Sequence, residues 1–468
     1  MLFKVNEELI ELADLFKRKG KTLYIVGGYV RNKLLNIPDN QNMDIDLCSA
    51  ATPDDVVKIL KNTRFSIKNI NNSFGVIKIV SENNMYDHAT FRTEKYAVAG
   101  SHNPSNVEFI EDLGVDALRR DFKCNAIYYD IYNDEIVDPL GGVNDVKNKI
   151  ISTTRKASDV FNDDSERIMR MIRQAATLGF TIDDETFNAA RYNVFKLAFL
   201  PRTRLKNEFE RILQANLEYK NLNVKIPHIR GIVMLAQLKI LGFILPCLQK
   251  MYDASIVDSK GNNLFDYSMK TLSICNERSL ELKYAILMQF YAETAIKINN
   301  LGKFGKSELE NSLIENELGD AGLSYNKKFI SAVKDICNNS SVNMIFSPKW
   351  KVRKFVAENL MQINNIILIK KYNSMANYGK INYTAKRIIS AQKEIKTYSY
   401  PTSVDMLKID YGYIIKEYPN ILPYKIPEIQ QMLLEKCIKN VKNNQKDMLI
   451  KLLSNIINKN KELYLEEV

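Results

Sequence analysis

The stretch TLYIVGGYVR, residues 22–31, decides the fold of the first part of the chain. Its opening TLYIV is rich in β-branched and aromatic residues and predicts a short strand. Gly27 and Gly28 then predict a tight turn, after which Tyr29-Val30-Arg31 opens a helix. A diglycine lets the backbone approach a phosphate closely, and a helix N-terminus attracts negative charge. Arg31 adds a fixed cation, although a plain strand-to-helix turn remains the alternative.

A second motif, NMDIDL at 42–47, alternates polar and apolar residues and predicts another strand. A period of two places Asp44 and Asp46 on one face of it. Adjacent carboxylates repel each other and have raised pKa values unless a cation lies between them. Mg²⁺ prefers such oxygen ligands. A solvent-facing edge strand is the alternative, but the nearby strand and diglycine turn favour a magnesium site.

Two later segments supply further candidate residues. YDHATFR at 86–92 predicts a strand that carries a candidate third carboxylate, with a polar surface strand as the alternative. LRRDFKCNA at 118–126 places two arginines and an acid before an apolar run, which suits a triphosphate or ribose clamp, because arginine makes bidentate phosphate contacts. A basic, capped loop is the alternative there. The candidates from these segments are Asp87, Arg92, Arg119, Arg120, Asp121 and Asn125.

The composition is that of a globular protein. Of 468 residues, 46% are hydrophobic and 26% are charged, which excludes global disorder. A chain of this length is expected to form about three domains. Lys and Arg (66) outnumber Asp and Glu (55), and the net charge of +11 favours a polyanionic partner such as nucleic acid.

Cysteine and histidine usage argues for a cytoplasmic protein without a zinc site. The six cysteines show no CxxC spacing and predict buried thiols in a reducing compartment, and there are only three histidines. The most apolar stretch, 231–248, contains Gln237, Lys239 and Pro246, so it predicts a buried helix rather than a membrane span. The N-terminal segment carries acids and helical periodicity, which is not typical of a signal peptide.

The first ~150 residues differ from the rest of the chain. Short β-rich runs at 22–26, 74–80 and 125–132 predict a small mixed sheet with helices on one side. From about residue 161 the pattern is almost entirely helical. Apolar residues from 168 to 178 follow helical spacing up to Gly179, and a second helix is expected at 202–213.

The motifs together resemble the class II tRNA nucleotidyltransferases, which comprise the CCA-adding enzymes and their bacterial poly(A) polymerase relatives. The resemblance rests on the order GGYVR, DID, ATFR, RRDFKCNA, DPLGG and DDSERIMRMIR, and is dense over residues 20–215. Beyond that it is faint, except at MLKIDYG, residues 406–412. It implies an α+β fold, in which a palm-like nucleotidyltransferase head of mixed β-sheet plus helices precedes an all-helical neck, body and tail. The expected divisions are 1–150 (head), 151–220 (neck, base recognition), 221–345 (body) and 346–468 (tail, tRNA binding).

The resemblance also implies an activity: template-independent addition of C, C and A to the tRNA 3′ end from CTP and ATP, with pyrophosphate release. Asp44 and Asp46 would hold two Mg²⁺ ions, with Asp87 as a further catalytic candidate. The segment with Asp138, Gly141, Gly142 and Asp145 would act as a hinge. The expected partner is tRNA, with no membrane and no protein partner. The expected nucleotide-binding residues are Gly27, Gly28, Arg31, Arg92, Arg119, Arg120, Asp121, Asn125, Asp164, Arg167, Arg170 and Arg173.

Base reading is assigned by the resemblance to Asp164 and Arg167, which match the second and last positions of the family's EDxxR pattern. Three residues apart on a helix, they would be neighbours on its surface. Cytosine and adenine both present an exocyclic amine beside a ring-nitrogen acceptor, so a carboxylate and a guanidinium can read either base. Guanine and uracil present the opposite order. A plain intrahelical ion pair is the alternative.

The chain departs from the family pattern at three places. It has Val30-Arg31-Asn32 where relatives often carry VRD, residues 100–104 replace a DxRxP-type element, and Lys123-Cys124 replaces Thr-Ile. The alternatives are a poly(A) polymerase, or a CC-only or A-only adding enzyme, on the same scaffold. A catalytically silent RNA-binding protein is a third class, against which Asp44 and Asp46 argue.

Overall fold

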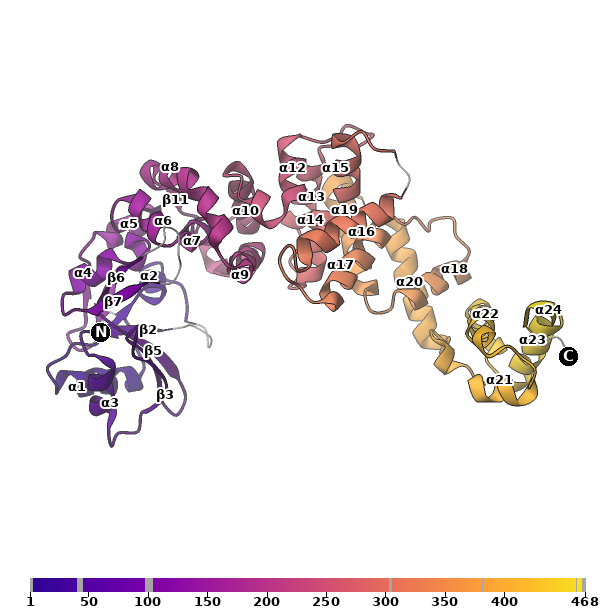
Figure 1. Ribbon diagram of the computed structural model, residues 1–468, viewed down its shortest axis with the longest axis horizontal. Coiled ribbons are helices and arrows are strands. Elements are labelled where there is room, and N and C mark those ends of the chain that lie inside the picture. Colours follow the sequence, from indigo (N-terminus) through magenta and orange to yellow (C-terminus); the bar gives the residue numbers. More distant parts are fainter. Residues whose placement is uncertain are drawn as a thin grey trace. The chain divides into compact units, whose positions relative to one another are not determined.

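The computed structural model describes residues 3–39, 45–96, 104–302, 305–380, 382–459 and 461–464. The chain forms two compact units, one of Met1–Ala254 with Asn316–Tyr325 and the other of Ser255–Glu315 with Asn326–Val468 (Figure 1). Each is described by itself below. The finer division into head, neck, body and tail stays a prediction.

A seven-stranded mixed sheet forms the head, as predicted, in the order β3-β4-β5-β2-β1-β8-β9. Its strands pair antiparallel except β2 with β5, which run parallel. The pairing aligns Asp46 with Val26 on one side and with Asp87 on the other. The strands are β1 (Tyr24–Val26), β2 (Asp46–Ser49), β3 (Ser66–Asn71), β4 (Val76–Val80), β5 (Met85–Thr90), β8 (Tyr128–Asp130) and β9 (Glu135–Val137). A separate ribbon pairs β6 (Arg92–Lys95) with β7 (Asn106–Phe109).

Helices cover both faces of this sheet, so the expectation of helices on one side is wrong. On one face, Phe16 of α1 (Glu7–Lys17) packs against His88, and α3 (Pro53–Leu60) contacts α1 (Figure 1). On the other face, Ala117 of α4 (Leu113–Leu118) packs in a buried cluster with Val26 and Cys48. Alternation along β2 and its neighbours gives both faces apolar residues, and each must be covered.

The diglycine joins β1 to α2 (Gly28–Leu34), as the sequence predicts. Gly27 has φ +83° and ψ −138°, a conformation that glycine adopts at little cost. A second glycine pair precedes α5 (Gly142–Asn148), where the Asp138 carboxylate accepts hydrogen bonds from the N–H groups of Gly142 and Val143 at 2.8 and 2.9 Å. A Cβ on Gly142 would lie 2.1 Å from the carbonyl oxygen of Lys123 in η1 (Lys123–Asn125), so only glycine lets these two segments pack.

The helices after the head follow the predicted periodicity. α7 (Glu166–Leu178) ends at Gly179, which has φ +73°, and α9 (Arg202–Leu213) has the expected bounds. The apolar stretch 231–248 is not one helix but falls in three, because Lys239 takes φ +61° and Pro246 starts a new helix. The helices of this part are α6 (Ala157–Asp163), α8 (Asp184–Asn193), α10 (Pro227–Gln237), α11 (Leu241–Ile244) and α12 (Pro246–Asp253). Within the described residues, no helix is long and apolar enough to cross a bilayer.

The second unit is helical in its described part. Its helices include α13 (Leu264–Ser273), α14 (Leu280–Met288), α15 (Tyr291–Ile298), α17 (Lys327–Ser340), α18 (Lys349–Glu358), α19 (Ile363–Tyr378) and α20 (Tyr383–Tyr398). They continue with α21 (Tyr411–Glu417), α22 (Ile426–Lys439), α23 (Lys446–Lys459) and α24 (Lys461–Tyr464), whereas α16 (Lys306–Leu318) spans the boundary between the units.

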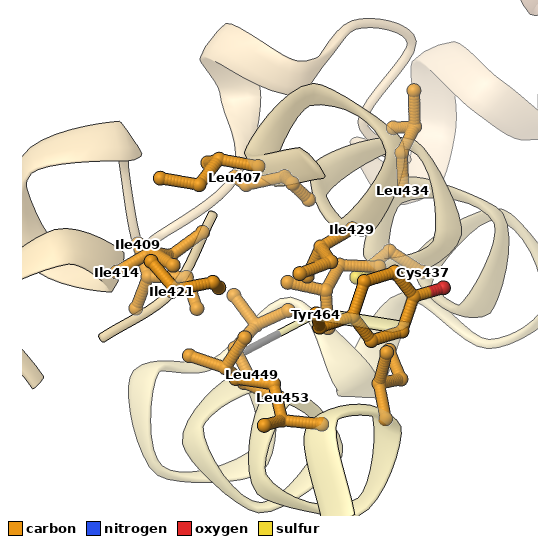
Figure 2. Close-up of a cluster of buried hydrophobic side chains, with 14 of the residues drawn as sticks. Leu407, Ile409, Ile414, Ile421, Ile429, Leu434, Cys437, Leu449, Leu453 and Tyr464 are labelled. Carbon is orange, nitrogen blue, oxygen red and sulfur yellow. The ribbon is translucent and has the colours of Figure 1, made fainter. Parts of the chain in front are cut away.

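The MLKIDYG segment serves packing in this second unit. Figure 2 shows Leu407 and Ile409 among the buried side chains from α21, α22 and α23. Leu407 is 8% exposed and Ile409 is 3% exposed. Asp410 accepts a hydrogen bond from the N–H of Tyr413 at 2.8 Å and so caps α21. The motif therefore places two alternate residues, Leu407 and Ile409, in the core and then begins a helix after the capping residue Asp410.

The contact between Gly142 and Lys123 yields a stability prediction. We expect Gly142→Ala to destabilise the protein by at least about 1–3 kcal/mol, because the backbone must move to admit the new Cβ. Gly242→Ala is the matched control, since its Cβ would meet only the Gln249 side chain at 3.9 Å. The measurement is the midpoint of thermal unfolding, and equal midpoints for the two variants would contradict the packing described here.

Candidate nucleotide-binding cleft

A cleft of about 870 Å³ lies in the first unit, bordered by the β1–α2 turn, η1, α7, α9 and the segment after α9. The structure brings most of the expected site residues to its lining, although they come from distant parts of the sequence. They are Gly27, Gly28, Arg31, Asp46, Arg120, Asp121, Asn125, Asp164, Arg167, Arg170 and Arg173.

Three expected residues are not part of this lining. Asp87 lies opposite Asp46 on the neighbouring strand, but its carboxylate is half exposed and pairs with Lys78 at 3.0 Å. Arg92 pairs with Glu94 at 2.7 Å, and Arg119 pairs with Asp116 at the same distance. Asp44 falls outside the described residues, as do residues 100–103 of the loop that departs from the family pattern. The roles expected of these residues stay predictions.

Asp46 is the first residue of β2 and lies outside the apolar part of the sheet face that it shares with Cys48. Cys48, two residues on, is fully buried, whereas Asp46 is exposed. A Cβ on Gly27 would lie 3.7 Å from the Oδ2 atom of Asp46, so the absence of a side chain there keeps space open beside the carboxylate. Carboxylate oxygen is a ligand that hard divalent cations prefer. Among the residues that the structure describes, no group of three or more His, Cys, Asp or Glu is arranged to hold a metal.

A buried polar network forms one wall of the cleft. Arg170 of α7 donates two hydrogen bonds to the Oδ2 atom of Asp121, at 2.9 and 2.7 Å. Asn125 donates to Asp121 and to Gln174, each at 3.0 Å, and accepts from Arg31 at 2.6 Å. The network therefore connects α2 and η1 of the head with α7.

Buried acids next to arginine have lowered pKa values. Burial alone raises the pKa of Asp121, but the charge of Arg170 and hydrogen bonds from Asn125 and Arg170 outweigh it and lower the pKa to about 2. Asp116 behaves in the same way: burial raises its pKa, and the charges of Arg120 and Arg119 bring it down to about 2. Both carboxylates are thus ionised anchors for the arginines around them.

The expected helical pairing of Asp164 with Arg167 is wrong in one respect. Asp164 is not helical: it takes an extended conformation (φ −144°, ψ 107°) between α6 and α7, and α7 begins at Glu166. Its carboxylate accepts a hydrogen bond from the N–H of Glu166, the first residue of the helix that Arg167 belongs to, at 2.9 Å. Arg167 donates to the carbonyl oxygens of Arg119 and Val160. Both residues still line the cleft.

The opposite wall comes from α9 and the residues that follow it. Glu208 pairs with Arg173 at 2.7 Å, and Arg204 pairs with Glu166 at 2.8 Å. These two ion pairs connect α9 with α7. Sequence reasoning missed the remaining lining residues Tyr29, Asn32, Gln174, Asn207, Leu217, Glu218 and Tyr219. Helical spacing could have found Gln174, which follows Arg170 by four positions, whereas nothing in the sequence marks 217–219.

Comparison with known proteins agrees with this geometry. Residues 23–152 match the family model described as the poly A polymerase head domain. The first part of the chain is therefore similar to that head domain. A CCA-adding enzyme of Streptococcus thermophilus is 34% identical over 209 residues, which are 45% of this chain and 50% of that protein. One from a Geobacillus strain is 32% identical over 220 residues, 47% of this chain and 52% of its own. The chain matches about half the length of these curated relatives.

Solved structures show the same fold over nearly the whole chain. The CCA-adding enzyme of Bacillus stearothermophilus, in complex with CTP, aligns with TM-score 0.69 and 18% identity over 97% of this chain and 98% of its own. That of Thermotoga maritima, complexed with tRNA, aligns with TM-score 0.58 and 19% identity over 97% and 96%. The head followed by helices is therefore the fold of the CCA-adding enzymes. Nucleotidyltransferases of this kind generally need a divalent metal ion.

The Asp116 anchor gives a pH prediction. Its folded pKa of about 2 lies below the reference value of 3.8, so the stability it contributes is full above pH 3.8 and is lost as the pH falls toward 2. We expect Asp116→Asn to cost about 3–5 kcal/mol at pH 7, because two arginines lose a buried partner. The difference in the free energy of unfolding between Asp116→Asn and the unchanged protein narrows as the pH falls below 3.8.

The measurement is urea unfolding of both proteins from pH 7 to pH 3. Asp54→Asn is the control, because Asp54 is exposed in the first turn of α3 and its loss should cost no more than about 1 kcal/mol. If the difference in the free energy of unfolding between Asp116→Asn and the unchanged protein stays constant with pH, Asp116 is not stabilised by its ion pairs with the arginines.

Proposed function

We propose that this protein is a template-independent tRNA nucleotidyltransferase that adds C, C and A to the tRNA 3′ end from CTP and ATP. The observation that carries the proposal is one cleft in which Asp46, the diglycine turn and the arginines of α7 converge. The relatives named above support it, since their structures contain CTP or tRNA. All six cysteines are buried, which agrees with thiols in a cytoplasmic protein.

For the metal, we propose Mg²⁺ held by Asp44 and Asp46, with Asp87 of β5 opposite Asp46. When bound, Mg²⁺ lowers the pKa of the RNA 3′-hydroxyl and neutralises charge on the departing pyrophosphate. The chain's own contribution is placement: β2 presents Asp46 at the mouth of the cleft, and Gly27 leaves room beside it. The attacking hydroxyl and the nucleotide α-phosphate would be brought together at this corner, in line with each other.

The nucleotide is proposed to lie along the cleft with its triphosphate toward α2 and its base toward α7. Arg31 is the cation beside the diglycine turn, and the arginines of α7 continue the positive lining. Asp164 and Arg167, both buried, would read the base: the carboxylate accepts from the exocyclic amine, and the guanidinium donates to the ring nitrogen. CTP and ATP satisfy both groups, whereas UTP and GTP leave them unpaired.

One assay separates this function from its alternatives. The protein is incubated with tRNA lacking CCA, Mg²⁺ and each nucleoside triphosphate, and the products are resolved at single-nucleotide length. Three added residues and a halt are expected. A long A tail would instead identify a poly(A) polymerase, a product that stops early would identify a CC-only or A-only enzyme, and no incorporation would leave an RNA-binding protein.

Asp44→Ala serves as the control within that assay. We expect it to lower incorporation at least about 100-fold, because metal stabilisation contributes several kcal/mol to the transition state. Its tRNA binding should be nearly unchanged. Substantial residual incorporation would contradict the metal assignment.

Base selection is tested separately at Arg167. We expect Arg167→Ala to lower the preference for CTP and ATP over UTP about 10- to 100-fold, the value of one hydrogen bond from a charged group. The measurement is kcat/KM for each nucleotide. Arg191→Ala, at an exposed position on α8, is the matched control and should keep the preference. Unchanged discrimination in Arg167→Ala would refute the reading role.

A further inference from the structure

Arg31 differs from Arg120, Arg170 and Arg173 of the cleft in what surrounds its charge. Its side chain is buried, with 6% of the residue exposed, and it still lines the cleft. A Cβ on Gly28 would lie 3.5 Å from its Nη2 atom, so the missing side chain leaves the guanidinium open toward the diglycine turn. A cation in this position must be stabilised by the protein or by a ligand, because an unpaired buried charge is costly.

The protein stabilises it with amide oxygens. Asn32 Oδ1 accepts from Nη2 at 2.8 Å and from Nε at 3.2 Å. Asn125 Oδ1 accepts from Nη1 at 2.6 Å, and Gln174 Oε1 accepts from the same nitrogen at 3.2 Å. In the described part of the chain, no carboxylate is within ion-pairing distance of Arg31, and Glu218 acts on it only at longer range. The charge is therefore solvated by three neutral groups and is not neutralised.

The neighbouring arginines have carboxylate partners instead. Arg120 pairs with Asp116, Arg170 with Asp121 and Arg173 with Glu208, at 2.7–3.1 Å. Their charges are largely compensated within the protein. Arg31 thus differs from these three arginines, because its charge is left for a ligand. Arg167, which is also buried, donates to the carbonyl oxygens of Arg119 and Val160 at the end of the cleft proposed to hold the base.

The network also keeps the nearest of these acids away from Arg31. Asn125 lies between Asp121 and Arg31, with its NH₂ group donating to Asp121 and its oxygen facing the guanidinium. Gln174 completes the arrangement from α7, because its Oε1 accepts from both Arg31 and Asn125. Gln174 is 4% exposed and so is held in this position by packing.

We propose that Gln174 is a positioning residue that fixes the Arg31 guanidinium with a neutral oxygen, so that its positive charge stays available to the triphosphate of the incoming nucleotide. This inference rests on the proposed function. A ligand with several phosphate oxygens completes the hydrogen bonding of Arg31 and supplies the counter-charge that the protein withholds. Because the triphosphate is common to CTP and ATP, the effect does not depend on the base.

Two substitutions separate this role from simple structural support. Gln174→Glu keeps the shape and the oxygen that accepts from Arg31 and Asn125, but gives Arg31 an internal counter-ion. Gln174→Met keeps the approximate size and leaves Arg31 charged, but removes the acceptor. A merely structural Gln174 would tolerate Glu better than Met, whereas the proposal predicts the reverse order for anion binding.

The experiment measures binding of CTP, ATP and inorganic triphosphate to the full-length protein by calorimetry at pH 8, without RNA. We expect Gln174→Glu to raise Kd at least about tenfold for all three ligands, equivalent to about 1.4 kcal/mol. This loss should approach that of Arg31→Met, while Gln174→Met stays closer to the unchanged protein. Asn188→Asp, which adds the same charge at an exposed position on α8, is the control and should bind normally.

Several results would overturn the inference. They are unchanged binding in Gln174→Glu, weaker binding in Gln174→Met than in Gln174→Glu, or a loss that differs between CTP and ATP. Thermal unfolding identifies a variant that does not fold, and if Gln174→Glu fails to fold, a loss in Gln174→Met as large as in Arg31→Met would also refute it. Binding of inorganic triphosphate needs no RNA. The order of affinities therefore tests the role of Gln174 even if the incorporation assay shows that the proposed function is wrong.

Discussion

Asp121 and Arg170 form an ion pair at 2.7 Å between the head and α7, and the cleft depends on it. Asp121 is buried and fully ionised near neutral pH, so its partner must stay in place or the charge is left uncompensated. The pair also orients Asn125, which in turn contacts Arg31 and Gln174. One ion pair therefore fixes the relation between the diglycine turn and the helix proposed to read the base.

Strand register decides where the proposed metal corner lies. Asp46 is the first residue of β2, opposite Val26, and is exposed, whereas Cys48 lies in the buried cluster. The parallel pairing with β5 brings Asp87 alongside. The glycine at the end of β1 keeps this corner open, because any side chain would approach the Asp46 carboxylate.

The charge of the cleft is smaller than its number of arginines implies. The chain carries a net charge of +11, and a large share of the basic residues in the cleft come from α2, α7 and α9. Most of those arginines hold Asp116, Asp121, Glu166 or Glu208 and serve to connect elements. Most of the arginines that line the cleft are therefore structural, and the charge available to a ligand is concentrated at Arg31 and Arg167.

The sequence by itself determined the elements of the head and the helices α7 and α9, because the periodicity of β1, β4 and α9 and the helix-ending Gly179 are local signals. It also indicated most of the cleft residues: those of the head through strand and turn motifs, and those of α7 through the resemblance to the class II tRNA nucleotidyltransferases. Tertiary structure decided the rest. Arg92 and Arg119 have the same chemistry as Arg31, but their neighbours Glu94 and Asp116 hold them away from the cleft lining. Gln174 and residues 217–219 line the cleft only because α7 and α9 pack together. Partners that lie far apart in the sequence are set by packing, and no local pattern records them.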